Sequence, residues 1–185
     1  FKNINFQFKK GKRILDVGCG DGTDALILKK IYKLKVYAIE PVSLFRKSLL
    51  RNTKKYKQVE IFPYALGKAD NVTVQMGIPR PSAYLSHGST HVIGNSEEED
   101  SYHISETTMF NPSTLFKDIP QLDYIKCDIE GFEIEVIPEL SEIISRFRPV
   151  IQIETGGQNR QYIFNMLEKM DYQCFFVNYK WLVKM

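Results

Sequence analysis

The sequence lacks paired cysteines. It contains three, Cys19, Cys127 and Cys174, and none of them forms a CxxC spacing. An odd number without that spacing argues against both a disulfide framework and a zinc site. We therefore expect three reduced thiols and a cytoplasmic protein, because the cytoplasm keeps thiols reduced.

The sequence also lacks a long apolar run and a large net charge. No stretch approaches the roughly 20 apolar residues of a membrane span. The 25 lysines and arginines exceed the 22 aspartates and glutamates by three. The lysines scatter over expected helix surfaces without forming a basic stripe, so we expect neither a membrane span nor a nucleic-acid partner.

The composition, with 43% hydrophobic and 25% charged residues, is close to that of ordinary globular domains. The length of 185 residues suits a single domain over 1–185. Strand-like and helix-like patterns alternate along the chain. The expected strands are 13–19, 35–41, 59–67, 72–76, 122–130, 149–154, 172–178 and 181–185. The expected helices are 24–33, 43–56 and 160–170, with one more after residue 130.

This alternation predicts an α/β fold with a doubly wound, mostly parallel sheet and helices on both faces. Ser43 is expected to cap the second helix, and Pro138 to kink the helix after residue 130 or to mark its start. The strand at 72–76 is expected to form a hairpin with the one before it. The last two strands are joined by a short link, which predicts an antiparallel pair.

Residues 77–113 break this pattern, because they are rich in glycine, proline, serine, histidine and acidic residues. A long insertion of this kind inside a domain is typical of a lid, a binding loop or a partly disordered segment. We expect this insertion to act as a lid or to contact the substrate.

The stretch ILDVGCGDGTDALIL, residues 14–28, runs from an expected strand through a glycine-rich bend into a helix. Gly18, Gly20 and Gly22 leave this bend without side chains, which indicates that something approaches the backbone closely. In an open α/β sheet, ligands bind beyond the carboxyl ends of the strands. Glu40 ends the next strand, where an acidic residue typically binds the hydroxyls of a ribose. These features together predict a cofactor that contains a nucleoside.

The charges at the bend distinguish between cofactors. The dinucleotide fingerprint GxGxxG would place its third glycine at position 23, which is Thr23 here. A pyrophosphate would lie at the start of the following helix, where Asp21 and Asp24 would repel it. The chain also has no GxxxxGK[ST] phosphate loop. We therefore expect a cationic cofactor without phosphate, and S-adenosylmethionine meets both conditions.

Four motifs occur in a recognisable order: ILDVGCGDG, VYAIEP, PYALG and IKCDIEGFEIEVI. Together they resemble the FkbM-type family of S-adenosylmethionine-dependent methyltransferases. The I-K-x-D-x-E-G-x-E block at 125–133 is the most specific of them, and the resemblance extends over residues 13–178. It implies a Rossmann-like class I methyltransferase fold, with a seven-stranded sheet and one antiparallel strand near the C-terminus. It also implies methyl transfer, usually to a hydroxyl oxygen.

The resemblance implies a role for each residue that matches the family motifs. The methionine end of the cofactor would be held at the glycine loop, Glu40 would bind the ribose, and the residues after the third strand would flank the adenine. Asp128 and Glu130 would face the reaction centre. The full set expected to bind the cofactor is Asp16, Gly18, Cys19, Gly20, Asp21, Glu40, Pro41, Tyr64, Ala65, Leu66 and Asp128.

Methyl transfer to a hydroxyl needs a base within hydrogen-bond reach. Asp128 and Glu130 lie two residues apart, so on a strand they would point to the same face. They could supply the base, cap the next helix or hold a divalent metal such as Mg²⁺, although we assign no metal ligands. His87 and His91 in the insertion are further candidates for the base, and His91 is included in the expected catalytic set with the two acids.

The expected function is therefore O-methylation of a hydroxyl on a sugar or glycan precursor, or on another small molecule. Two other classes stay open: a Rossmann-type nucleotide or dinucleotide enzyme, and an inactive binding module with the same fold. Methylation of nucleic acid is disfavoured, because DIEG stands where such enzymes usually carry a motif that clamps the base.

Overall fold

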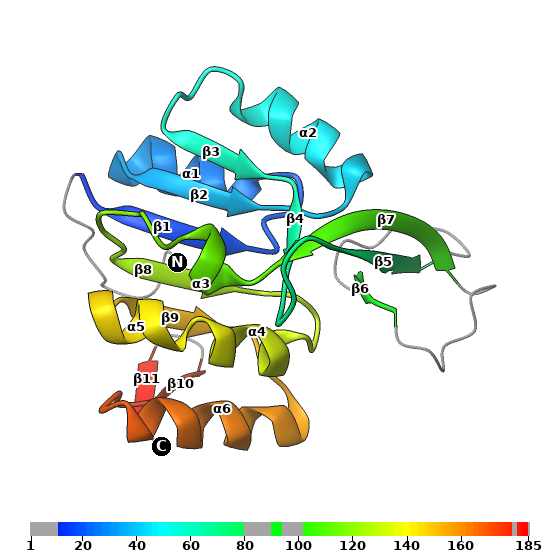
Figure 1. Cartoon of the computed structure of the whole chain (residues 1–185). Coiled ribbons are helices and arrows are strands. Elements are labelled where there is room, and N and C mark those ends of the chain that lie inside the picture. The colour runs from blue at the N-terminus through cyan, green and yellow to red at the C-terminus, as the bar shows by residue number, and fades with distance from the viewer. Residues whose placement is uncertain (1–10, 80–89, 94–101, 179–180, 185) are drawn as a thin grey trace.

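The computed structural model describes residues 11–79, 90–93, 102–178 and 181–184. Its centre is a sheet of five parallel strands. From one edge to the other these strands are β3 (Val59–Phe62), β2 (Lys35–Ile39), β1 (Arg13–Val17), β8 (Tyr124–Cys127) and β9 (Val150–Ile153). The chain moves outward from β1 to β3 and then returns to the other side of β1 as β8 (Figure 1). This reversal of strand order is the place where open α/β sheets bind ligands.

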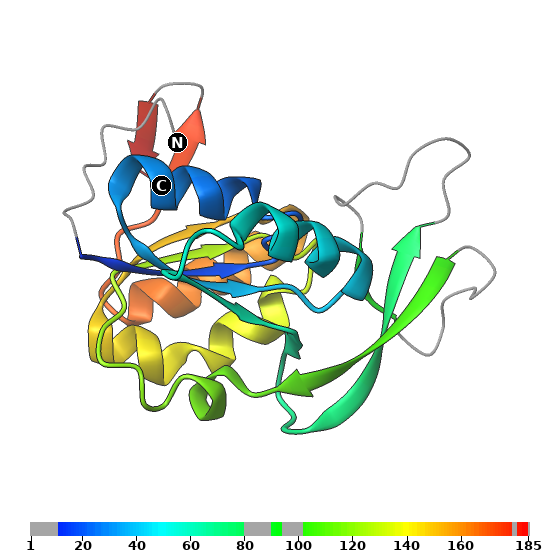
Figure 2. The same cartoon turned by 90° about the horizontal axis from the view of Figure 1, so that it is seen from above.

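Helices cover both faces of this sheet (Figure 2), as the alternating pattern predicts. They are α1 (Thr23–Tyr32), α2 (Ser43–Thr53), α3 (Pro112–Leu115), α4 (Glu133–Glu139), α5 (Ser141–Phe147) and α6 (Gly157–Lys169). Successive strand residues point to opposite faces. Leu15 and Val17 of β1 therefore pack in one core with residues of α4, α5 and α6. Ile14 of the same strand packs in a second core with residues of α1 and α2.

A second sheet extends from the end of β3. Its four strands, in order, are β4 (Tyr64–Leu66), β7 (Tyr102–Phe110), β5 (Val72–Pro79) and β6 (His91–Val92). The single strand expected at 59–67 is therefore two strands in different sheets. They are divided at Pro63, which has no N–H to continue a hydrogen-bond ladder. The expected hairpin is wrong, because β5 pairs antiparallel with β7 and β6 while β4 pairs parallel with β7.

The insertion at 77–113 contains more regular structure than its composition indicates. It includes the end of β5, all of β6 and β7, and the start of the short helix α3. Residues 80–89 and 94–101 lie outside the described part of the chain, and His87 is among them. The role of this insertion as a lid or substrate contact stays a prediction.

Two helix boundaries differ from expectation. Ser43 is the first residue of α2 and not its cap, because the N-cap is Val42 and makes no side-chain cap hydrogen bond. The helix expected after residue 130 is two helices that meet at Leu140. Pro138 lies inside α4, near this break, and cannot donate the backbone hydrogen bond of a continuing helix.

The last two strands, β10 (Phe175–Asn178) and β11 (Trp181–Lys184), pair antiparallel as expected. They form a two-stranded sheet of their own, and the central sheet holds five strands in the described part of the chain. The expected seven-stranded sheet is therefore not confirmed. No helix among the described residues is long and apolar enough to cross a bilayer.

Candidate functional site

The glycine-rich bend follows β1 and lies against two other parts of the chain. Gly18 and Gly22 have φ angles of 77° and 82°, in the left-handed region that favours glycine. A Cβ on Gly18 would lie 1.9 Å from the carbonyl oxygen of Asp128, and one on Gly22 would lie 2.4 Å from Cδ1 of Leu49. The side chains at these two positions are therefore excluded by the chain itself, whether or not a ligand is bound.

Glu40 follows β2 and is 4% exposed. Its carboxylate accepts hydrogen bonds from the backbone N–H groups of Gly20 and Val42, each at 2.8 Å. Burial raises the pKa of Glu40 from 4.5 to about 7, although both hydrogen bonds oppose the rise. These contacts fix the carboxylate beside the glycine bend, and each of its oxygens keeps a further lone pair for a ligand.

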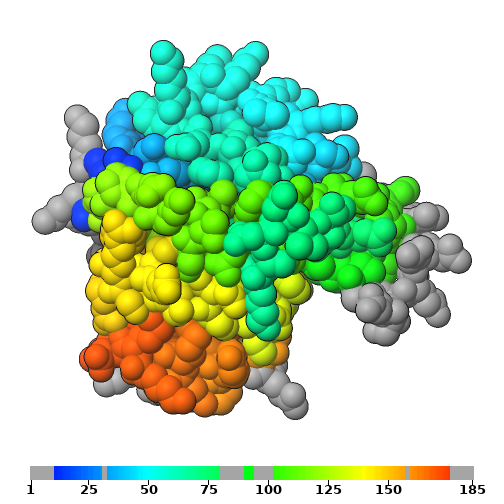
Figure 3. Space-filling view, in the orientation of Figure 1, coloured from blue at the N-terminus to red at the C-terminus, as the bar shows by residue number. Residues whose placement is uncertain are grey.

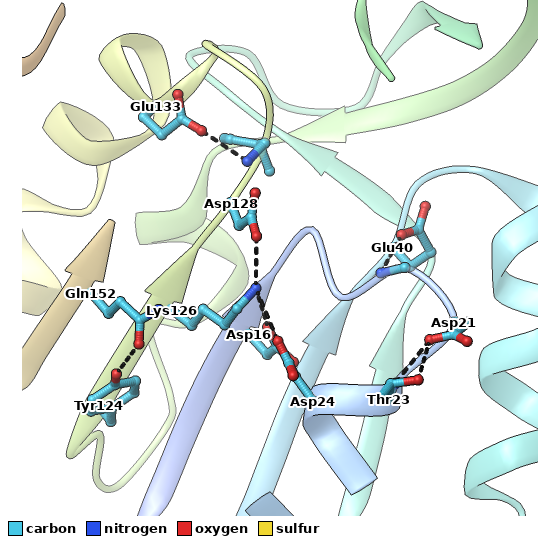
Figure 4. A network of polar contacts seen from close by, with 12 residues as sticks. Asp16, Asp21, Thr23, Asp24, Glu40, Tyr124, Lys126, Asp128, Glu133 and Gln152 are labelled. Carbon is cyan, nitrogen blue, oxygen red and sulfur yellow. Dashed lines mark hydrogen bonds and ion pairs between the residues drawn. The ribbon is translucent and has the colours of Figure 1, made fainter. Parts of the chain in front are cut away.

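Lys126 of β8 is a buried cation between three carboxylates (Figure 4). Its side chain is 8% exposed, and Nζ lies 3.1 Å from Oδ2 of Asp128 and 3.5 Å from Oδ2 of Asp24. Oδ1 of Asp16 is 3.9 Å away. Burial opposes the charge of Lys126, but these carboxylates outweigh it and raise the pKa of the ammonium. The network joins the end of β8 to β1 and to the first turn of α1.

Asp16 of β1 is fully buried, and neither of its carboxylate oxygens has a hydrogen-bond partner among the described residues. Burial raises the pKa of Asp16 from 3.8 to about 7, with Lys126 opposing the rise. A buried acceptor without a donor is costly and calls for a physical explanation. A cationic ligand that donates hydrogen bonds beneath the glycine bend would supply one.

The turn after β8 carries several acidic residues. The strand ends at Cys127, so Asp128 and Glu130 do not lie on it, and Glu130 has a φ angle of 55°. Burial and the neighbouring Asp128 raise the pKa of Glu130. Asp128 is also the main cause of the raised pKa of Glu154, which follows β9. Several acidic groups therefore gather at the carboxyl ends of β8 and β9.

Glu133, the first residue of α4, accepts a hydrogen bond from the backbone of the turn before this helix. Its carboxylate accepts a hydrogen bond of 2.8 Å from the backbone N–H of Ile129, and Glu133 is 1% exposed. Glu133 is therefore a buried carboxylate at the start of α4, held by a backbone N–H of the preceding turn. The N-cap residue of α4 is Phe132, which makes no side-chain cap hydrogen bond.

A cavity of about 170 Å³ opens at the carboxyl ends of β1, β2 and β8. Ten residues of the expected cofactor-binding and catalytic sets line it, and they come from five separate stretches of the chain. They are Gly18, Gly20, Glu40, Pro41, Tyr64, Ala65, Leu66, His91, Asp128 and Glu130. The chain thus brings together residues that are up to 112 positions apart, as 18 and 130 are. Their roles in binding and catalysis stay predictions.

Three expected cofactor residues do not line the cavity. Asp16 is buried under the bend, and Cys19 packs in the core against α1, where burial raises the pKa of its thiol. Asp21 turns toward the start of α1, where Oδ1 accepts hydrogen bonds from the backbone N–H and the hydroxyl of Thr23, at 3.0 and 2.8 Å. The roles of these three residues also stay predictions.

Other cavity residues have no counterpart in the expected set. Most are apolar and come from β1, β2, α2, the second sheet and the turn before α4. They are Val17, Ile39, Val42, Phe45, Met76, Thr90, Val92, Ile129 and Phe132. His91 lies on β6, and its ring packs edge-on against the ring of Tyr102 on β7, with centroids 5.3 Å apart. His103 lies on β7 and is exposed.

The described residues contain no group of three or more histidine, cysteine or acidic side chains arranged to hold a metal ion. The expectation of Mg²⁺ therefore has no support from this arrangement. Asp128 instead forms an ion pair with the ammonium of Lys126.

Comparison with known proteins gives several likenesses. The chain is 25% identical over 143 residues to a ribosomal protein L11 methyltransferase from Acetivibrio thermocellus, covering 74% of this chain and 42% of that protein. A crystal structure of a methyltransferase FkbM from Methylobacillus flagellatus KT has a TM-score of 0.61 at 15% identity, covering 90% of this chain and 38% of that one. A precorrin-6y C5,15-methyltransferase from Geobacter metallireducens GS-15 has a TM-score of 0.52 at 14% identity, covering 97% and 78%.

The two structural likenesses show the fold and confirm that it is of the α/β methyltransferase type. The chain spans less than half the length of the L11 methyltransferase and of the FkbM structure. The methyltransferase FkbM domain family matches residues 16–174. Because this match covers most of the sequence and confirms the resemblance seen in its motifs, the chain belongs to the methyltransferase FkbM domain family.

Proposed function

We propose that the chain binds S-adenosylmethionine in this cavity and transfers a methyl group to a hydroxyl oxygen of an uncharged acceptor. The acceptor would be a sugar, a glycan precursor or another small molecule. One observation carries the proposal: the described cavity lining includes Glu40, Asp128 and Glu130 but no lysine or arginine. A phosphate would meet negative charge there, whereas a cationic nucleoside would meet compensating charge.

The residues present fit this cofactor. Close to the glycine bend, Asp16 offers a buried carboxylate to which no described residue donates a hydrogen bond, which suits the cationic methionine end. Glu40 is held beside Gly20 and suits the ribose hydroxyls, and the apolar wall at Ala65 and Leu66 suits an adenine. When bound, S-adenosylmethionine supplies an activated methyl group on a sulfonium.

We assign proton removal from the acceptor to Glu130, and a positioning role to Asp128. The carboxylate of Asp128 is engaged in an ion pair with the ammonium of Lys126, at 3.1 Å. Glu130 lines the cavity, and its raised pKa suits a base that takes a proton near neutral pH. His91 lies in the same cavity and is the alternative base.

The acidic character of the cavity also bears on the acceptor. A phosphorylated or carboxylated acceptor would be repelled by Asp128 and Glu130, while a neutral hydroxyl compound would not. The apolar part of the lining, including Phe132 and Met76, can pack against a sugar ring or an alkyl chain and exclude water.

Calorimetric titration with S-adenosylmethionine, NAD and ATP tests the cofactor assignment. We expect binding of S-adenosylmethionine alone. Glu40→Gln should weaken it at least about tenfold, because one charge-assisted hydrogen bond contributes about 1.5–3 kcal/mol. Glu60→Gln is the matched control, since Glu60 is an exposed residue of β3 that pairs with Lys35. Binding of NAD in preference, or equal affinity in the two variants, would refute the assignment.

Turnover is measured as formation of S-adenosylhomocysteine with a panel of neutral monosaccharides and simple alcohols. Glu130→Gln should lower kcat by about 10²–10⁴, the usual contribution of a general base. Asp128→Asn should change the KM for the acceptor in addition to kcat, because it removes one carboxylate partner of Lys126 beside the cavity. If Glu130→Gln keeps full activity and His91→Ala loses activity, the base is the histidine. Cofactor binding without turnover of any acceptor would favour the inactive binding module.

A further inference from the structure

The positive charges of this chain are concentrated in one part of the fold. Residues 25–59, which run from α1 through β2 and α2 to β3, hold ten of the 25 lysines and arginines and only one of the 22 acidic residues, the buried Glu40. Fifteen basic and 21 acidic residues are left for the rest of the chain. The small net charge of +3 therefore hides a basic part and an acidic part.

The exposed face of α2 combines this charge with apolar side chains. At 100° per residue, Lys47, Arg51 and Lys54 fall on the helix surface between Leu44 and Leu50. We call these five residues the basic α2 face. The two leucines are 45% and 52% exposed, although the opposite side of the same helix already buries Phe45, Leu49 and Thr53. Helices that lie on membrane surfaces combine lysines and arginines with apolar side chains that enter the boundary between headgroups and acyl chains. The exposed side of α2 offers both kinds of residue.

The position of α2 connects this face to the candidate site. Val42, the N-cap of α2, and Phe45 in its first turn both line the cavity. In Figure 3 the cyan part of the surface, which includes α2 and the residues that follow it, forms the upper end of the molecule. Two more lysines, Lys55 and Lys57, follow the helix and are exposed. A partner that contacts the basic α2 face would therefore contact the same helix whose first turn lines the cavity.

We propose that the basic α2 face is a docking surface for an anionic lipid bilayer. The helix would lie in the plane of the bilayer surface, with Leu44 and Leu50 among the upper acyl chains and the lysines and arginine against lipid phosphates. Charge complementarity supports this occupant, and the excess of acidic residues elsewhere orients the molecule with α2 toward the membrane. The exposed leucines favour a bilayer over a nucleic acid, because a polyanion in water offers them no apolar environment.

Sedimentation with vesicles tests this proposal without depending on methyl transfer. We expect the chain to bind vesicles of phosphatidylcholine mixed with phosphatidylserine, and not vesicles of phosphatidylcholine alone. High salt should weaken the binding, because it screens the attraction between exposed charges. Equal binding to both vesicle types, or none to either, would overturn the proposal.

Two pairs of matched variants separate charge from apolar insertion. Lys47→Glu with Lys54→Glu should lower vesicle affinity at least about twentyfold, since each basic residue near an anionic surface contributes about a fivefold factor. Lys117→Glu with Lys169→Glu changes the net charge equally at exposed positions outside the face and should have little effect. Equal losses in both charge variants would show a non-specific effect of net charge and refute the assigned face.

Leu44→Ser with Leu50→Ser should remove most of the binding that persists at moderate salt. Val72→Ser with Ile104→Ser is its control, because these two residues are 45% and 39% exposed but lie on the second sheet. Circular dichroism checks that every variant is folded. Vesicle binding that survives in the leucine variant, or tighter binding of the wild-type chain to single-stranded RNA than to anionic vesicles, would overturn the bilayer as the occupant.

Discussion

Lys126 is one cation buried beside three carboxylates, so the charges around it do not balance. Asp24 is partly exposed and can be solvated, while Asp16 is fully buried and has no hydrogen-bond donor in the described part of the chain. Such an arrangement is unfavourable for the empty protein, because buried ions cost free energy unless they are paired. The unpaired negative charge is what a cationic ligand would neutralise, which links the stability of this residue cluster to the proposed function.

Lys126→Met tests the electrostatic role of the ammonium. We expect the free energy of unfolding to fall by about 3–5 kcal/mol near pH 7.5, because the substitution leaves buried carboxylates without their cation. The loss should be smaller near pH 5. The pKa of Asp16 is already raised to about 7 in the folded chain and would rise further without the ammonium. The folded variant therefore binds more protons than its unfolded chain between pH 5 and pH 7.5, and its stability falls as the pH rises from the first value to the second.

Urea unfolding at the two pH values measures this effect. Lys12→Met is the control, because Lys12 pairs with Asp123 nearer the surface and its loss should cost only about 0–1 kcal/mol. An equal loss at both pH values in Lys126→Met would mean that the stem of the side chain stabilises the core by packing, and that its charge contributes little.

The same residues show how far sequence reasoning reaches at this scale. Glu40 and Asp128 could be placed near the site because each follows a strand that ends at the same edge of the sheet. Lys126 carried a usable signal, since it is a charged residue inside the otherwise apolar strand YIKC. Glu133 carried none, because its burial depends on the backbone N–H of Ile129 in a turn that no periodicity describes.

At the scale of elements, the close approach of β1 to the turn after β8 explains one glycine. Gly18→Ala would place a Cβ 1.9 Å from the backbone oxygen of Asp128 at a φ angle of 77°. The strand or the turn must then move, and we expect a loss of at least about 4 kcal/mol, the range of severe packing defects. Gly131→Ala is the matched control, because Gly131 also has a positive φ of 97° but nothing lies within 4 Å of its added Cβ.

The control should lose only about 1–2 kcal/mol, from backbone strain alone. Urea unfolding, or the folded fraction by circular dichroism if Gly18→Ala does not fold, gives the comparison. Similar losses in the two variants would show that left-handed backbone strain, and not the contact between β1 and the turn, is the reason for glycine at position 18.

The elements that local pattern predicted are those that form or pack on the central sheet. The helices α1, α2 and α6 show helical spacing of apolar residues, and the strands β1, β2, β8 and β9 are short, mainly apolar runs, so the sequence indicates both their type and their order. The second sheet was missed because its pairing is long-range. β4 at 64–66 pairs with β7 at 108–110, and the burial of β7 does not alternate regularly. The seven strands implied by the family resemblance depended on where β10 and β11 join, which their own sequence does not specify.

At the scale of the whole molecule, the acidic site and the proposed cationic cofactor form a linked system. Burial raises the pKa of both Asp16 and Glu40 to about 7, so both carboxyls are largely protonated in the empty protein at pH 6. A cationic ligand favours their ionised forms. Its binding should therefore release protons, and its affinity should rise with pH while these groups titrate.

We expect the affinity for S-adenosylmethionine to increase between about pH 5.5 and pH 7, by up to about tenfold per pH unit for each coupled carboxyl. Calorimetric titration in buffers of different ionisation enthalpy counts the protons released on binding. Asp16→Asn should reduce that number, because one of the two titrating groups is gone, whereas Asp70→Asn on the surface should leave it unchanged. An affinity that stays constant or falls over this pH range, or net uptake of protons, would show that cofactor binding does not favour the ionised forms of these two buried acids.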